Sequence, residues 1–235
     1  MILILVLQID SVYEVYLNKL YSSEQNEVKS AYEFFKKMSI ARSNKYDLYF
    51  CAYSLQILYF STKEFNKEKF LDEAIKLLEK AIKIDNKFSE AYALLSGLYG
   101  IKAGMNIFYG MFYGPKASQM IRKALEIDSL NPRVMYAYAQ NLIYTPPAYG
   151  GDFDKGVEIL KRIINKYENG YKDSGIIKWG YKESIFALAI AYEERKDYKN
   201  AYIYYKKLVD IEPNNEFYKN KVKEMKYPYP VFDRL

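Results

Sequence analysis

The sequence contains no histidine, which is the commonest general base and the commonest metal ligand in enzymes. It has a single cysteine, so an internal disulfide and a cysteine-cluster metal site are both excluded. Cys51 lies in the apolar run DLYFCAYSLQILYF, which predicts a buried, unreactive thiol. Carboxylates such as Glu193 and Glu194 are adjacent and therefore point to different sides of a helix. We therefore expect no enzyme activity, no catalytic residue, no metal and no cofactor.

A long hydrophobic run is also missing. The apolar segment MILILVLQI, residues 1–9, is far shorter than the roughly 20 residues that a membrane-spanning helix needs, so we expect no stable membrane insertion. Two interpretations of this segment stay open: it is a truncated export signal without its basic start, or it begins the first helix. The first is slightly favoured, and with it a periplasmic or other extracytoplasmic location over a cytoplasmic one.

The basic residues are not concentrated in one part of the chain. Lysine and arginine number 35 against 29 acidic residues, which gives a formal charge of +6. The basic residues stand mostly beside acids, as in Glu79-Lys80 and Lys83-Asp85, which is typical of a solvated helical surface. A nucleic-acid partner would require a concentrated basic stripe, and we expect none.

What the chain does have is a repeated helical pattern. A small residue is followed by bulky ones four and seven positions later, which places all three on one helical face. A period of about 40 residues indicates stacked helical units, because one unit alone cannot bury its apolar face. With no strand-like alternation, the sequence predicts an all-α fold. The small residue of the pattern recurs at five places: Ala31, Ala74, Ala117, Gly156 and Ala201.

The periodicity also predicts where the helices lie. After an apolar segment at 1–9 and a divergent helix pair within 10–44, we expect repeats over 45–214, then a capping helix and tail at 215–235. Two long connectors, 101–114 and 169–180, are predicted to be insertions on one face of the stack. The expected helices from the first repeat on are 45–61, 67–84, 88–104, 116–128, 132–144, 153–168, 181–195, 198–211 and about 215–226.

Three motifs have both a functional and a structural interpretation, and we favour the structural one for each. The string TPPAYGGD at 145–152 lacks the preceding strand and the Lys-Ser/Thr of a phosphate loop, so it is interpreted as a helix stop, a tight turn and an N-cap at Asp152. The aromatic string FYGMFYG at 108–114 is expected to be a loop packed onto the stack. Trp179 is expected to hold the 169–180 connector in place rather than to stack on a ligand.

The repeats resemble tetratricopeptide repeats, a family of 34-residue helix–turn–helix units. From residue 182 to 213 the match has the family's length, whereas the other units carry about 5–10 extra residues. The string NPRVMYAYAQNLIYTPPAYGGD is also similar to exported bacterial members of unassigned activity. The first-helix pattern of a large residue, Leu, a small residue and Tyr is carried by Tyr92, Leu95, Ser96 and Tyr99, and by Ile185, Leu188, Ala189 and Tyr192, with Pro213 at the family's terminal proline.

The resemblance implies a right-handed solenoid of antiparallel helix pairs, with insertions, whose first helices line a concave face. Such an aromatic surface with a few polar groups suits an extended peptide or an apolar ligand. Its tyrosines can equally pack against the insertions, and this alternative stays open. Carried over position by position, the family's ligand-binding residues fall on Tyr49, Tyr53, Arg133, Tyr136, Gln140, Tyr144, Phe186 and Glu193.

The sequence therefore favours a non-enzymatic scaffold that binds a protein or peptide partner, with assembly into a homo-oligomer left open. The alternative is an accessory protein of an extracytoplasmic transport system that holds a small apolar or organic-acid ligand in an aromatic cavity. A closed cavity lined by tyrosines would favour this alternative, whereas an open, continuous face would favour the scaffold.

Overall fold

The computed structural model describes residues 2–22, 24–63 and 65–226. Within these ranges the regular elements are eleven α-helices and one short 3-10 helix, with no strand. The predicted all-α class is confirmed. The chain divides into two compact units, unit 1 (Met1–Ser129) and unit 2 (Leu130–Leu235). The division falls inside the predicted repeat region, next to the Asn131-Pro132 junction.

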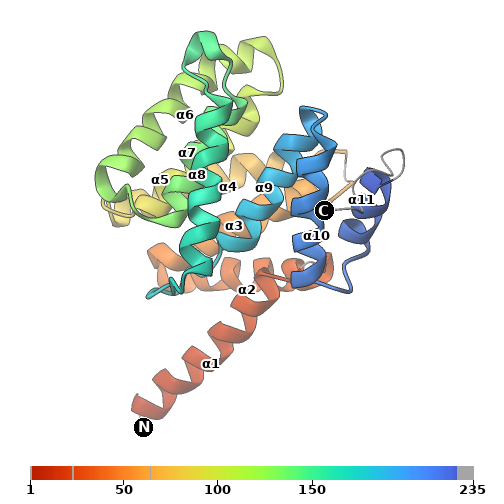
Figure 1. Ribbon diagram of the computed structural model, residues 1–235. Helices are drawn as coiled ribbons and strands as arrows, with labels where there is room; N and C mark the ends of the chain where they lie inside the picture. Colours follow the sequence, from red (N-terminus) through yellow and green to blue (C-terminus); the bar gives the residue numbers. More distant parts are fainter. Residues whose placement is uncertain (1, 23, 64, 227–235) are drawn as a thin grey trace. The chain divides into compact units, whose positions relative to one another are not determined.

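Unit 1 is a stack of helices in which each packs against the next along the chain (Figure 1). The first helices of successive pairs, α3 and α5, also touch each other. Contacts restricted to near neighbours are the pattern of a helical-repeat protein. The helices of unit 1 are α1 (Ile2–Leu20), α2 (Gln25–Arg42), α3 (Lys45–Ser61), α4 (Glu68–Ile84), α5 (Ser89–Ala103) and α6 (Ile107–Asp128).

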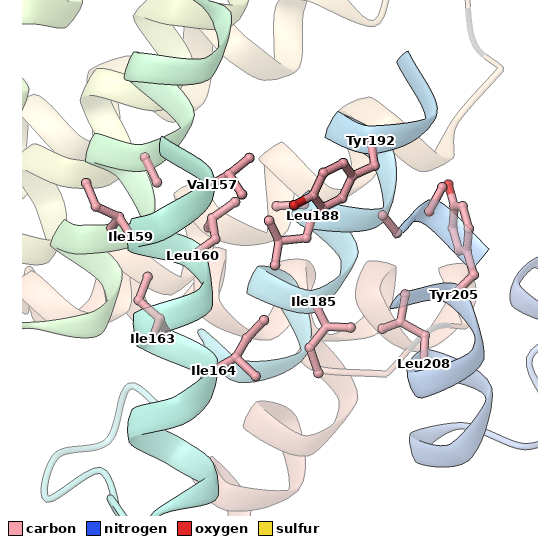
Figure 2. Close-up of a cluster of buried hydrophobic side chains, with 14 of the residues drawn as sticks. Val157, Ile159, Leu160, Ile163, Ile164, Ile185, Leu188, Tyr192, Tyr205 and Leu208 are labelled. Atoms are coloured by element: carbon pink, nitrogen blue, oxygen red, sulfur yellow. The ribbon is translucent and has the colours of Figure 1, made fainter. Parts of the chain in front are cut away.

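Unit 2 repeats this arrangement, with α7 touching both α8 and α9. Its core lies between α8, α9 and α10: Leu160 and Ile164 face Ile185 of α9, while Tyr205 and Leu208 pack from α10 (Figure 2). The elements of unit 2 are α7 (Pro132–Tyr144), η1 (Pro147–Tyr149), α8 (Phe153–Glu168), α9 (Tyr181–Glu194), α10 (Tyr198–Ile211) and α11 (Glu216–Lys226).

The predicted insertion at 101–114 is wrong. Helix α5 continues to Ala103, and α6 begins at Ile107, where the Asn106 side chain accepts a hydrogen bond from the backbone N–H of Tyr109 at 2.9 Å. Gly and Pro in this string favoured a loop. Packing outweighs that preference, because Tyr113 stacks on Tyr99 of α5 with ring centroids 5.8 Å apart. Pro115 is accommodated on the exposed side of the helix.

The expected packing of the FYGMFYG string is correspondingly only half right. Tyr109 and Tyr113 are partly buried, but three apolar side chains on the other side of the same helix are mostly exposed: Phe108 by 79%, Met111 by 75% and Phe112 by 57%. The loop interpretation could not predict this difference, because only a helix places alternate groups of these side chains on a buried side and an exposed side.

The turn interpretation of TPPAYGGD is confirmed. Helix α7 ends at Tyr144, and Gly150 adopts a left-handed backbone conformation with φ of 93°. Asp152 then caps α8 by accepting a hydrogen bond from the backbone N–H of Lys155 at 3.0 Å. The backbone N–H of Asp152 also donates to the carbonyl oxygen of Leu142 at 2.9 Å, which closes the turn. These hydrogen bonds stabilise the turn.

The small residues of the repeat pattern are buried, as their spacing predicts. Ala31, Ala74 and Ala201 have no exposed surface, and Ala117 is 3% exposed. Gly156 has no room for a side chain, because a Cβ atom there would lie 2.6 Å from Cγ1 of Ile143. These positions let neighbouring helices approach closely.

Replacing Ala124 by leucine is expected to lower the free energy of unfolding by about 1–3 kcal/mol through overpacking. Ala124 is fully buried on the inner side of α6. Gln119→Leu, at an exposed position of the same helix, is the matched control and should change stability little. Urea unfolding of both variants makes the measurement, and equal midpoints for the two would show that the repeat register is wrong.

Candidate functional site

The described residues offer no evident chemical centre. Among them, no group of three or more cysteine, aspartate or glutamate side chains is placed to hold a metal ion. Cys51 is fully buried, and burial raises the pKa of its thiol to about 12. None of the described helices is both long and apolar enough to pass through a bilayer. The candidates that remain are the eight residues expected to bind a ligand.

Tyr49 and Tyr53 lie in the core of unit 1. Their side chains are 0% and 6% exposed, and the Tyr49 ring packs against Phe50 and Phe88 with centroids 5.5 Å and 5.3 Å away. The expectation that these two tyrosines line an accessible face is corrected by their burial. Helix α3 is apolar on nearly all sides, so its sequence does not indicate which side faces outward.

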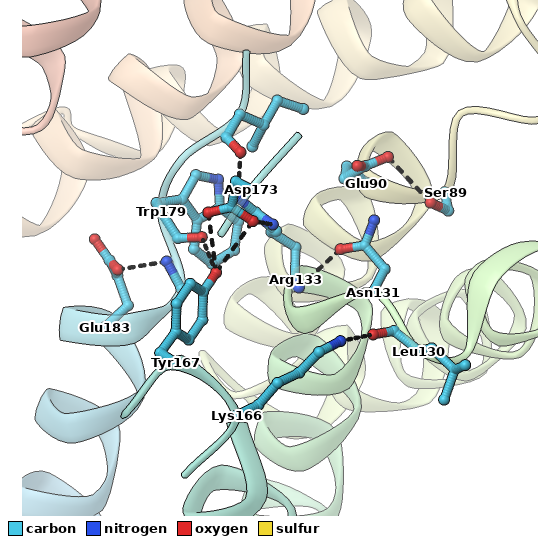
Figure 3. Close-up of polar contacts among 12 residues, drawn as sticks. Ser89, Glu90, Leu130, Asn131, Arg133, Lys166, Tyr167, Asp173, Trp179 and Glu183 are labelled. Carbon is cyan, nitrogen blue, oxygen red and sulfur yellow. Dashed lines mark hydrogen bonds and ion pairs between the residues drawn. The ribbon is translucent and has the colours of Figure 1, made fainter. Parts of the chain in front are cut away.

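The Arg133 side chain is also buried and paired with other residues of the protein. Its guanidinium Nη1 pairs with Oδ1 of Asp173 at 2.5 Å, and its Nη2 donates to the carbonyl oxygen of Ile177. The Tyr167 hydroxyl lies 3.2 Å from the other oxygen of Asp173 (Figure 3). Arg133 is 3% exposed, so the expectation that it contacts a ligand is corrected. It fastens the connector 169–180 onto α7.

Trp179 completes this anchoring. It is 5% exposed, and its ring meets Tyr136 of α7 edge to face with centroids 5.4 Å apart. The expectation that Trp179 holds the connector in place agrees with this packing. Burial raises the pKa of the Tyr136 hydroxyl, and the nearby Glu183 raises it further.

Glu193 joins three helices. Its Oε2 accepts a hydrogen bond from the Tyr205 hydroxyl at 2.6 Å, and its Oε1 pairs with Nζ of Lys221 at 2.6 Å. These contacts fasten α9 to α10 and α11. The carboxylate was expected to meet a ligand; this stays a prediction, and both of its oxygens already have partners within unit 2.

The remaining four predicted residues come together on adjacent first helices. Tyr136, Gln140 and Tyr144 follow one another at four-residue spacing along α7, and Phe186 occupies the position in α9 that Tyr136 has in α7. The two helices touch. Tyr136 lies near Glu183 at the start of α9, and Tyr144 lies near Glu194 at its end.

Helix α11 extends this surface. Phe186 packs against Phe217 and Tyr218, with ring centroids 6.1 Å and 5.9 Å away. Phe217 is 49% exposed and Tyr144 is 51% exposed. We call the set Tyr136, Gln140, Tyr144, Phe186 and Phe217 the aromatic face of unit 2.

The Gln140 side chain is the most informative member of this face. Its Nε2 atom is buried without a hydrogen-bond partner. An amide nitrogen left in this state costs about 1–3 kcal/mol relative to a paired one. Such a group at the centre of an aromatic surface is a candidate donor to a bound acceptor.

Several residues that shape this region were not predicted from the sequence. Asp173, Tyr167 and Lys221 fix the connector and the helices, but none stands at a first-helix position of a repeat. Asp173 is 40 positions from Arg133. No local periodicity links residues at such a separation, so only the packed chain shows that they are partners.

Comparisons with known proteins agree with the repeat assignment. Residues 183–215 match the family model of the tetratricopeptide repeat. The fold is similar to the HusA haemophore from Porphyromonas gingivalis, with a TM-score of 0.66, 23% sequence identity and coverage of 79% of this chain and 93% of that one. It is also similar to TTC0263, a thermophilic tetratricopeptide-repeat protein of Thermus thermophilus, with a TM-score of 0.62, 15% identity and coverage of 85% and 91%. No curated protein sequence matches the chain. The chain thus contains a tetratricopeptide repeat within a helical-repeat fold of that type.

Proposed function

We propose that this chain is a non-enzymatic scaffold that binds an extended segment of a partner protein on the aromatic face of unit 2. The observation that carries the proposal is the unpaired amide nitrogen of Gln140 between two tyrosines. A backbone carbonyl of an extended peptide is an acceptor that would satisfy this donor. The tetratricopeptide repeat at 183–215 supports the same role, because repeats of this kind present extended binding surfaces.

The face also indicates what the partner segment should contain. Tyr144 and Phe217 are half exposed and offer flat apolar contact area with few rotatable bonds. Glu194 is exposed beside Tyr144 and favours a positive charge on the ligand. The expected partner is therefore an extended peptide with apolar side chains and at least one lysine or arginine.

A second candidate function is the binding of a flat, apolar small molecule. The specific observation in its favour is the fold similarity to a protein described as a haemophore. The half-exposed ring of Tyr144 offers such a molecule a surface for stacking. An open depression of about 550 Å³ in unit 1 is a less suitable site for it, because its lining includes Lys36, Lys80 and Lys83 but no aromatic ring.

Selection from a random peptide library of about 12 residues tests the first function directly. Peptides enriched on the full chain should carry lysine or arginine. Tyr144→Ala should then weaken the selected peptides by about 2 kcal/mol, or roughly 30-fold, as expected of a binding hot spot. Tyr149→Ala is the matched control, because Tyr149 is an 82% exposed tyrosine of the same unit outside the aromatic face.

Two outcomes would contradict the proposal. One is a library that yields no binding peptide, and the other is a set of peptides that bind Tyr144→Ala and the unaltered chain equally. Titration with protoporphyrin IX, read by its absorbance, tests the second function. Porphyrin binding that is lost in Tyr144→Ala, together with a failed peptide selection, would establish the small-molecule role instead.

A further inference from the structure

Helix α11 runs in the same direction as α9. Phe217, near the start of α11, packs against Phe186 in the first half of α9. Lys221, one turn further along α11, pairs with Glu193 near the end of α9 at 2.6 Å. Lys226, the last residue of α11, therefore lies at the same end of unit 2 as the end of α9.

The aromatic face reaches this end of unit 2 as well. Tyr144 is the last residue of α7 and lies near Glu194, the last residue of α9. Helix α9 touches both α7 and α11, so it lies between them. Packed helices have axes about 8–10 Å apart, which puts Tyr144 roughly 16–20 Å from the end of α11.

The residues that follow α11 have the composition of a ligand for this face. Residues 227–235 lie outside the described residues, and their sequence is YPYPVFDRL. Pro228 and Pro230 each fix their own φ and restrict the residue before them to an extended conformation. Most of the other side chains are aromatic or aliphatic, and Arg234 carries a positive charge. The segment is thus an extended, apolar peptide with one basic residue, as the aromatic face requires.

We propose that residues 227–235 occupy the aromatic face of unit 2 in the free chain, as an intramolecular ligand that a partner segment must displace. An extended, proline-containing chain advances about 3.1 Å per residue, so the six residues from Lys226 to Phe232 span about 19 Å. This length matches the distance to α7 and places Phe232 on the Tyr144 ring. The inference rests on the proposed function, because it assigns a competitor to the same peptide-binding surface.

The unpaired amide nitrogen of Gln140 suits this segment. Gln140 stands one turn before Tyr144 on α7, and its Nε2 atom is buried without an acceptor. An extended chain forms no internal backbone hydrogen bonds, so its carbonyl oxygens are available as acceptors. One of these carbonyls satisfies Gln140 when the segment lies across α7.

The exposed carboxylate at the end of α9 fits the same placement. Arg234 stands two residues beyond Phe232 and is within reach of Glu194, next to Tyr144. The adjacent Arg195 contacts α8 instead, where its guanidinium lies 4.2 Å from the ring centroid of Phe153. A pair at the surface contributes little affinity, so we expect the apolar contacts to dominate.

A tethered segment needs only modest affinity to act as a competitor. A short linker gives an effective concentration on the order of 1 mM. A segment with an intrinsic Kd of about 100 µM would then fill the face about 90% of the time, and a competing peptide would bind about 10-fold more weakly.

Fluorescence anisotropy of a labelled peptide with the sequence of residues 226–235 tests the proposal. In the full chain, Tyr229→Ser/Phe232→Ser should empty the face. This variant should therefore bind the peptide at least about 10-fold more tightly than the unaltered chain does. Adding Tyr144→Ala to the variant should remove the gain, because the peptide then loses its main contact.

The matched control is Tyr149→Ser/Ile203→Ser. It removes one aromatic and one aliphatic side chain, 82% and 49% exposed, from other parts of unit 2. This control should bind the peptide as weakly as the unaltered chain does. Circular dichroism confirms that each variant is folded.

The proposal is overturned if the peptide does not bind Tyr229→Ser/Phe232→Ser, or binds it no more tightly than the unaltered chain. It is also overturned if sedimentation shows chain association that this variant abolishes, because the segment would then occupy a second copy.

The peptides selected from the random library separate this inference from the proposed function. If they bind the unaltered chain and Tyr229→Ser/Phe232→Ser equally well, and lose affinity with Tyr144→Ala, the intramolecular ligand is wrong and the peptide-binding function stands. If no library peptide binds either chain, both are wrong.

Discussion

Arg133→Met is expected to lower the free energy of unfolding by about 3–5 kcal/mol, the range for removing one partner of a buried ion pair. The side chains of Arg133 and Asp173 are 4% and 9% exposed. Without the guanidinium, the Asp173 carboxylate stays buried without a cationic partner, and the Ile177 carbonyl loses its donor. The connector 169–180 should then detach from α7. Urea unfolding followed by circular dichroism makes the measurement.

Two comparisons show whether the buried charge is the cause. Arg133→Met/Asp173→Asn should be more stable than Arg133→Met alone, because the uncompensated carboxylate is gone. Lys123→Met breaks an exposed ion pair with Glu126, whose side chains are 49% and 65% exposed, and should cost less than about 1 kcal/mol. A loss for Arg133→Met no larger than that for Lys123→Met would contradict the anchoring role.

Gly151→Ala is expected to lower the free energy of unfolding by about 2–4 kcal/mol. A Cβ atom at this position would overlap the carbonyl oxygen of Thr145 and lie 2.6 Å from its carbonyl carbon. Both contacts are with backbone, so no side-chain rotation relieves them. The turn would have to open, which breaks the hydrogen bond from the backbone N–H of Asp152 to the Leu142 carbonyl.

The matched control for this substitution is Gly175→Ala. Gly175 lies in the other connector of unit 2, and a Cβ atom there would meet nothing within 4 Å. Its replacement should leave the urea midpoint nearly unchanged or raise it slightly, because alanine restricts the unfolded chain. If both variants unfold at the same urea concentration, the close approach at Gly151 does not exist in the folded protein.

The sequence predicted most helices correctly because their signals are local. Helices α3, α7, α8 and α10 have the predicted bounds, since apolar periodicity and caps such as Asn131 and Asp152 act within a few residues. The failure at 101–114 has the opposite cause. Gly110, Gly114 and Pro115 favoured a loop, but packing against α5, including the stacking of Tyr113 on Tyr99, stabilises the helix there.

The candidate site could be predicted less completely than the fold. Repeat position indicated Tyr136, Gln140, Tyr144 and Phe186, which lie on adjacent helices as the resemblance implied. It does not distinguish a residue available to a ligand from one already bound within the chain. Arg133 and Glu193 occupy first-helix positions too, but their charges are neutralised by residues that lie far away in sequence.

The sequence by itself therefore determined the all-α class, the repeat and the turns, because these depend on spacing and backbone preference over a few residues. The tertiary structure alone decided which side chains are available. Exposure and charge pairing depend on atoms from distant segments, as when Asp173 closes over Arg133 or Phe88 packs against Tyr49. The same holds for the outward side of α6, whose apolar residues are exposed because no other segment covers them in the described part of the chain.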